Sequence, residues 1–270
     1  MPRYHSPMDL EILSRHPAGA AHRVPLLFVH GAWHGAWCWA EHFLDFFAAQ
    51  GFAAHAVSLR GHGASAGHER LRRTRIADYV ADVAAVAATL PQPPVLIGHS
   101  MGGLVVQKFL ERHTVPGAVL LAPVPPSGVL GTTLRLARRH PLIFLRVNLT
   151  LSLYPLVATP RLARECFFSE DLPDARVNAC WEKLQDESFR AFVDMLALDL
   201  PRPIQGSTPM LVLGAGKDTI FTPAEVSATA AAWGAELEIL PNIAHDMMLE
   251  PQWQAVAMRI SEWLGRTQSH

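Results

Sequence analysis

The pentapeptide Gly98-His99-Ser100-Met101-Gly102 has the residue types and spacing that nucleophilic chemistry at a serine requires. Apolar residues 94–97 before it predict a buried strand, and apolar residues at helical spacing after it predict a helix. The flanking glycines leave room for the strained backbone that a sharp strand-to-helix turn imposes on its central residue. The helix also directs backbone N–H groups and the positive end of its dipole toward the turn. We therefore predict that Ser100 attacks a carbonyl carbon.

A serine nucleophile needs a base and an acid that orients the base. Asp218 and His245 stand in loops that follow two later predicted strands, and loops at the carboxyl ends of parallel strands share one edge of a sheet. The chain order Ser, Asp, His is the one expected for a serine at such a turn. We predict that His245 takes the proton of Ser100 and that Asp218 fixes the imidazole.

Each of these residues also has a simpler interpretation. The pentapeptide fits a plain glycine-rich turn, Asp218 fits a turn aspartate, and His245 is one of 14 histidines. Asp246 is a rival acid, but it adjoins His245, so its carboxylate reaches the outer imidazole nitrogen less easily. An N-terminal helix cap is the better interpretation of Asp246.

The oxyanion of the reaction needs two N–H donors. The first is predicted to be the backbone amide of Met101, directly after the nucleophile. The second should come from the loop that follows the apolar run 25–30. We assign it to Ala32, because Gly31 permits a close backbone approach, and keep Trp33 as the alternative.

The elements that position these residues alternate between strands and helices, which predicts an α/β fold with a doubly wound, mostly parallel sheet. Predicted strands cover residues 9–13, 25–30, 52–59, 94–97, 117–122, 210–214 and 236–240. Residues 123–207 break the alternation, with helical patterns at 134–149, 162–168 and 176–198 and prolines near both ends. We predict a core of residues 1–122 and 208–270 and an inserted helical cap, which is defined here as residues 123–207.

Composition excludes several classes of function. The chain has 270 residues, 50% hydrophobic and 17% charged, with a net charge of −1, so a basic nucleic-acid face is not expected. No apolar run reaches the roughly 20 residues of a membrane-spanning helix, and residues 1–6 do not read as a signal peptide. The 3 cysteines match no zinc pattern and suit a reducing cytoplasm. We expect a cytoplasmic protein without a metal site.

The motifs at the predicted strand ends resemble those of the α/β-hydrolase family: His30-Gly31, Gly61-His62-Gly63, residues 98–103, Lys217-Asp218 and His245-Asp246. The resemblance covers nearly the whole chain apart from the cap and implies a serine esterase or lipase-like enzyme. Residues 34–37 resemble the plant methyl esterase and hydroxynitrile lyase branch. Residues 59–65 resemble the lysophospholipase and monoacylglycerol-lipase branch instead, so the subfamily stays open. Halide- and epoxide-cleaving relatives use an aspartate nucleophile, and Ser100 argues against both.

The sequence thus predicts a cofactor-free serine hydrolase that cleaves a small-molecule carboxylic ester with a medium apolar moiety. Other reactions on the same triad (lactone, amide or carbon–carbon hydrolysis, cyanohydrin cleavage) and a ligand receptor with little turnover are the alternatives. Trp33, His99 and Phe144 are candidate substrate contacts. The alternative roles are packing for Trp33, bracing of the turn for His99 and a place in the cap core for Phe144. A homodimer is a possible assembly.

Overall fold

The computed structural model describes residues 9–19, 21–206 and 208–267. The expectation about a signal peptide concerns residues 1–6, which lie outside the described residues, as does residue 207 at the end of the cap. Among the described residues, no helix is long and apolar enough to cross a membrane.

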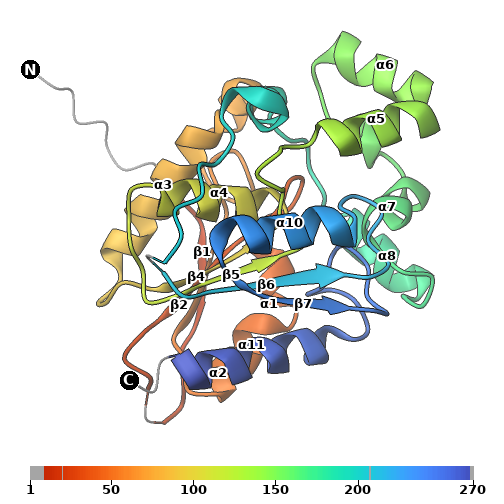
Figure 1. The fold of residues 1–270 in the computed structure, drawn as a ribbon. Coiled ribbons are helices and arrows are strands. Elements are labelled where there is room, and N and C mark those ends of the chain that lie inside the picture. Colours follow the sequence, from red (N-terminus) through yellow and green to blue (C-terminus); the bar gives the residue numbers. More distant parts are fainter. Residues whose placement is uncertain (1–8, 20, 207, 268–270) are drawn as a thin grey trace, which may run out of the picture.

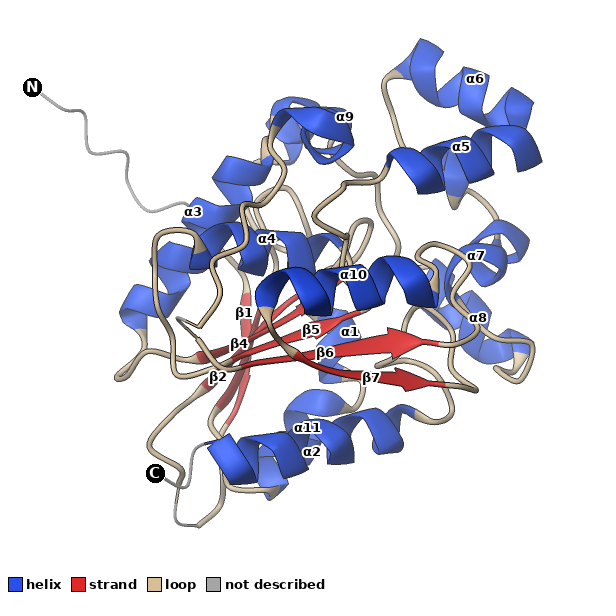
Figure 2. Ribbon diagram, viewed as in Figure 1, coloured by secondary structure: helices blue, strands red, loops and turns tan. Residues whose placement is uncertain are grey.

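A seven-stranded sheet runs through the molecule in the order β1-β3-β2-β4-β5-β6-β7 (Figures 1 and 2). Only β1 pairs antiparallel, with β3, and the other neighbours pair parallel. The strands are β1 (Ile12–Arg15), β2 (Leu26–Val29), β3 (Ala54–Val57), β4 (Val95–His99), β5 (Ala118–Leu121), β6 (Met210–Ala215) and β7 (Glu236–Leu240). The predicted doubly wound, mostly parallel sheet is confirmed.

Helices cover both faces of the sheet, and this is why its central strands are continuous apolar runs. Figure 2 shows α3, α4 and α10 on one face and α2 and α11 on the other. The helices outside the cap are α1 (Trp37–Ala40), α2 (Phe43–Ala49), a 3₁₀ helix (His68–Arg73), α3 (Ile76–Thr89), α4 (Met101–Leu110), α10 (Pro223–Trp233) and α11 (Trp253–Thr267).

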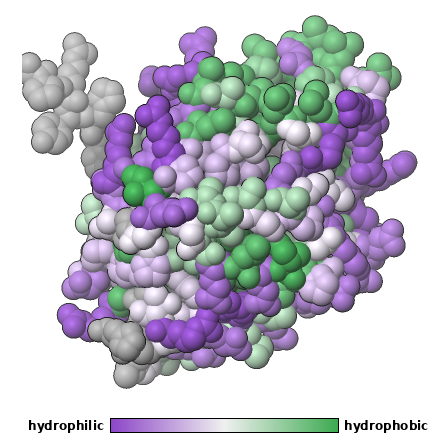
Figure 3. All heavy atoms as spheres, viewed as in Figure 1, coloured by the Kyte–Doolittle hydropathy of each residue, from purple (hydrophilic) through white to green (hydrophobic). Residues whose placement is uncertain are grey.

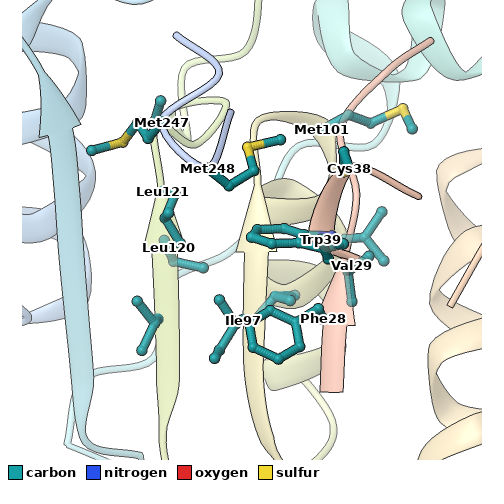
Figure 4. Close-up of a cluster of buried hydrophobic side chains, with 14 of the residues drawn as sticks. Phe28, Val29, Cys38, Trp39, Ile97, Met101, Leu120, Leu121, Met247 and Met248 are labelled. Atoms are coloured by element: carbon teal, nitrogen blue, oxygen red, sulfur yellow. The ribbon is translucent and has the colours of Figure 1, made fainter. Parts of the chain in front are cut away.

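Strand β4 lies between β2 and β5, and the core below its carboxyl end is tightly filled (Figure 4). Phe28, Ile97 and Leu120 of the three strands are fully buried there. Met247 and Met248, two and three positions after His245, are also fully buried. The buried methionines therefore anchor the loop that carries the predicted base.

The segment between β5 and β6 is helical, and residues 123–206 contain no strand. Its elements are α5 (Leu130–Arg139), α6 (Pro141–Thr150), a 3₁₀ turn (Tyr154–Leu156), α7 (Pro160–Phe167), α8 (Asp174–Trp181), α9 (Phe189–Val193) and a π-helical turn (Asp194–Leu198).

Two helices that the sequence predicts as continuous in the cap are each interrupted. The helix predicted at 134–149 is split between α5 and α6, because His140 precedes Pro141 and leaves helical geometry at φ −132° and ψ 64°. The helix predicted at 176–198 is split into α8 and α9, with residues 182–188 between them. The edge strand predicted at 9–13 also begins later, at Ile12.

Candidate active site

Ser100 occupies a strained turn between β4 and α4. Its backbone has φ 53° and ψ −118°, a conformation that L-residues rarely adopt. Glycine is required on both sides, because a Cβ on Gly98 would lie 2.5 Å from the carbonyl oxygen of Gly102, and one on Gly102 would lie 2.3 Å from that of Val29. The amide of Ser100 donates to the carbonyl of Leu121 at 3.0 Å. This hydrogen bond to the neighbouring strand β5 helps to hold the turn in its strained conformation.

Asp218 and His245 come together at the carboxyl edge of the sheet. Nδ1–H of His245 donates to Oδ2 of Asp218 at 2.8 Å, and both side chains are buried. The second carboxylate oxygen, Oδ1, accepts the amides of Ile220 at 2.7 Å and Phe221 at 3.1 Å. Because Nδ1 of His245 donates, the lone pair of the neutral ring lies on Nε2. This tautomer is the one that a general base for a serine needs.

The surroundings of His245 raise its pKa. Burial alone lowers the pKa, because it disfavours the charged ring. The charge and hydrogen bond of Asp218, together with the charge of Asp246, outweigh this effect and place the pKa above the ordinary 6.5. The ring is therefore a stronger base than an isolated histidine.

The two predicted oxyanion donors lie at the same cavity as Ser100. Ala32 and Met101 line this cavity, and among the hydrogen bonds of the described residues neither of their amides has an acceptor. A Cβ on Gly31 would lie 3.0 Å from Cβ of Ser100, so only glycine permits this approach of the loop. Trp33, the alternative donor, has a positive φ of 65° and also lines the cavity.

Asp246 binds His34, which no sequence pattern links to the site. Its carboxylate accepts Nε2–H of His34 at 2.9 Å, and Nδ1–H of His34 donates to the carbonyl oxygen of Ala32 at 2.7 Å. Burial raises the pKa of Asp246, but the neighbouring His34, His99 and His245 lower it below its ordinary value.

His34 and Asp246 are both buried, and their hydrogen bond joins the loop of Ala32 to the loop of His245. The side chain of Asp246 does not cap α11, which begins only at Trp253. The interpretation of Asp246 as a helix cap is wrong. No short-range pattern links His34 to Asp246, because 212 positions separate them.

The remaining predicted contacts lie in different places. Trp33 lines the cavity. His99 is buried, is absent from the cavity wall, and donates Nε2–H to the carbonyl oxygen of His245 at 3.0 Å. Burial and the neighbouring His245 lower the pKa of His99 to about 3, so its ring is neutral. Phe144 is half-buried on α6, away from the cavity lining.

The cavity at Ser100 is apolar, and core and cap build it together. Its lining comprises Ala32, Trp33, Ser100, Met101, Val124, Val129, Thr132, Thr133, Leu136, Leu153, Leu156, Phe192, Met195, Ile220 and Phe221. The hydroxyls of Thr132 and Thr133 donate to the backbone carbonyls of Ile220 and Val129. No charged side chain belongs to this described lining. A bound molecule therefore meets a mainly apolar wall around Ser100 and the two amides.

A second buried pair fastens the cap to the core. Glu187 of the cap accepts Nε2–H of His62 at 3.0 Å and the hydroxyl of Tyr79 at 2.7 Å. The side chains of Glu187 and His62 are fully buried. Nearby, the amide of Gln185 donates to the carbonyl oxygen of Trp33 at 3.0 Å. His62 thus braces a loop. The cap also contacts Trp33, the residue of positive φ next to Ala32.

Within the described residues, one group of side chains has the spacing of metal ligands. His99, His245 and Asp246 offer atoms within 4.8 Å of one another. Each is already engaged, because His245 binds Asp218, His99 binds the carbonyl of His245, and Asp246 binds His34. These hydrogen bonds explain why the three side chains lie close together: they support the predicted triad.

Comparisons with known proteins identify the family of the fold. A model of the alpha/beta hydrolase family matches residues 26–259. The pFDCC methylesterase of Arabidopsis thaliana is 26% identical over 242 residues, which cover 84% of this chain and 89% of the relative. A non-heme haloperoxidase of Rhodococcus erythropolis is 37% identical over 110 residues, which cover 38% of each chain. The match thus spans well under half the length of that relative.

The fold also agrees with solved structures. A thermophilic esterase from Thermogutta terrifontis superposes with a TM-score of 0.72 at 19% identity, covering 96% of this chain and 94% of the esterase. A likeness at this low identity supports the arrangement of strands and helices.

Proposed function

The chain belongs to the alpha/beta hydrolase family, and from that premise we propose that it cleaves a carboxylic ester through an acyl-enzyme on Ser100. The observation that carries the proposal is the meeting of a strained serine and two unbonded amides at one apolar cavity. The methylesterase among its relatives supports an ester as the bond that is cleaved.

In the first half of the reaction, Nε2 of His245 takes the proton of Ser100 as Oγ bonds to the acyl carbon. The carbonyl π electrons move to oxygen, and the amides of Ala32 and Met101 stabilise this oxyanion. When the oxyanion collapses, the bond to the alcohol oxygen breaks and His245 donates its proton to the leaving alcohol. The products of this half are an acyl-enzyme and a free alcohol.

In the second half, His245 takes a proton from water while the water oxygen bonds to the acyl carbon. The bond to Oγ then breaks, and His245 returns the proton to Ser100. The carboxylic acid leaves and the enzyme is restored. Asp218 stabilises the imidazolium in both halves without taking its proton.

The apolar cavity supports a substrate with an uncharged apolar moiety of medium length. Each methylene buried there adds about 0.8 kcal/mol, close to a fourfold gain in binding. An apolar moiety displaces water from the apolar wall. A charged moiety would lose its hydration there, and the lining has no charged side chain to compensate that loss.

The experiment is kcat/KM across p-nitrophenyl esters of about two to about twelve carbons, with and without a chelator. We expect a rise from the acetyl ester to esters of medium length and no loss on chelation. A flat or falling profile rejects the apolar substrate, and loss on chelation rejects a cofactor-free reaction. Ser100→Ala should lower kcat by about three orders of magnitude or more, and turnover by that folded variant rejects the acyl-enzyme.

A further inference from the structure

Apolar surface is exposed on the helical hairpin of the cap, residues 130–151, which comprises α5 and α6. Figure 1 shows the hairpin projecting from the molecule, and Figure 3 shows apolar atoms gathered on that side. Leu142 and Leu149 of α6 are 80% and 76% exposed, the highest values for large apolar side chains in the described residues. Leu130, Leu134, Leu145 and Leu151 are also exposed. Clustered exposure of this kind marks an interaction surface.

The exposed leucines follow the helical period. On α6, Leu142, Leu145 and Leu149 share one side, and Val147 on the opposite side is buried. On α5, Leu130 and Leu134 are exposed one turn apart, and Leu136 on another side lines the cavity at Ser100. One helix therefore joins the exposed surface to the wall of the candidate active site.

The hairpin carries cations and no anions. Its arginines are Arg135, Arg138, Arg139 and Arg146, and residues 130–151 contain no Asp or Glu. Arg135 and Arg139 are paired with Glu225 and Glu165. Arg138 and Arg146 are exposed and have no acidic partner in the part of the chain that the structure describes. Each stands one helical turn after an exposed leucine.

We propose that this hairpin docks onto an anionic lipid surface, from which the ester enters the cavity at Ser100. The lipid source of the substrate rests on the proposed function. Exposed leucines enter the boundary between head groups and acyl chains, and Arg138 and Arg146 meet anionic head groups. A second copy of the chain fits less well, because a two-fold interface sets the arginines of one copy against those of the other.

The test is sedimentation of the full chain with vesicles of phosphatidylcholine, with and without phosphatidylglycerol. We expect binding to the anionic vesicles and weaker binding in high salt. The triple change Leu142→Ser, Leu145→Ser and Leu149→Ser should weaken binding about tenfold or more. Arg138→Gln with Arg146→Gln should weaken it by a similar factor. Met258→Ser on α11, which is 55% exposed, and Arg112→Gln, also exposed, are matched controls that should change little.

Activity on a water-soluble p-nitrophenyl ester separates this inference from the proposed function. The leucine variant should keep that activity, because the three leucines are absent from the cavity lining, and lose the acceleration of an ester dissolved in vesicles. Wild-type protein that stays in the supernatant, or binding that survives the leucine change, overturns the docking surface. A dimer in sedimentation velocity that the leucine change dissociates also overturns it, in favour of contact between copies. Absence of turnover of the soluble ester overturns the proposed function instead.

Discussion

At the scale of single residues, two aspartates lie beside the predicted base and have different partners. Asp218 holds Nδ1 of His245, and Asp246 holds His34. Only the first contact fixes the tautomer on which proton transfer depends. The second contact holds His34, whose Nδ1 in turn binds the carbonyl oxygen of Ala32, the residue of the predicted oxyanion donor. The two carboxylates therefore differ in what their removal does.

We expect Asp218→Asn to lower kcat by about 10⁴-fold, because the amide favours the wrong tautomer. Asp246→Asn should lower kcat by less than about tenfold, because its amide can donate to Nε2 of a neutral His34 whose Nδ1–H still binds Ala32. Steady-state kinetics of both variants, with circular dichroism as the check on folding, decide the matter. Equal losses in the two variants contradict this assignment of the acid.

The pH dependence of kcat/KM follows from the raised pKa of His245. The base acts when neutral, so activity rises as pH increases through that pKa, and the midpoint should lie above the ordinary 6.5. His99, whose ring lies 4.8 Å from that of His245, has a pKa of about 3 and adds no second step near neutrality. Asp218→Asn removes the largest contribution that raises the pKa, so the residual activity of that variant should have its midpoint at lower pH. A midpoint that stays in place shows that another group titrates.

At the scale of elements, the sequence predicts what periodicity and strand ends can report. Apolar runs locate β2, β4, β5 and β6, because strands buried on both faces leave no polar positions. The loops that follow β6 and β7 then bring Asp218 and His245 together. Pro141 indicates a break between α5 and α6, but the apolar period through it favours one helix.

Buried polar pairs are the part that the sequence does not predict. Glu187 follows irregular cap residues, and its partners His62 and Tyr79 lie 125 and 108 positions earlier. Periodicity treats a glutamate as a surface residue, because burial of a charge is costly unless tertiary structure supplies a partner. For the same reason, the sequence does not predict the pair of His34 and Asp246.

Glu187→Gln tests how much the buried pair contributes to holding the cap. The change leaves His62 with an uncompensated charge or forces it to lose its proton in a buried place, and we expect unfolding free energy to fall by about 3 kcal/mol. Chemical denaturation measures this loss. Glu182→Gln, five positions earlier and exposed, is the matched control and should change stability by less than about 0.5 kcal/mol. Equal stability of the two variants would refute the anchoring role.

At the scale of the whole molecule, core and cap divide the candidate site between them. Ser100, Asp218 and His245 stand on loops of the sheet, which the buried strands hold rigid. Most of the cavity wall comes from the cap, whereas the hydrogen bond of Asp218 and His245 joins two loops of the core. Chain-length preference should therefore be adjustable in the cap at little cost to the reaction itself.

Phe192→Ala tests this division of labour. Phe192 lies on α9 and lines the cavity, so its loss should lengthen the space for an apolar chain. We expect the optimum of kcat/KM to move to longer esters, while kcat for the acetyl ester stays within about threefold, because that ester needs only the groups at Ser100. Phe189→Ala is the matched control: Phe189 stands on the same helix, with its ring 5.9 Å from that of Phe192, but is absent from the cavity lining. It removes the same volume and should leave the optimum in place, and a common shift in both variants would mean that loosening of α9, rather than the length of the cavity, sets the preference.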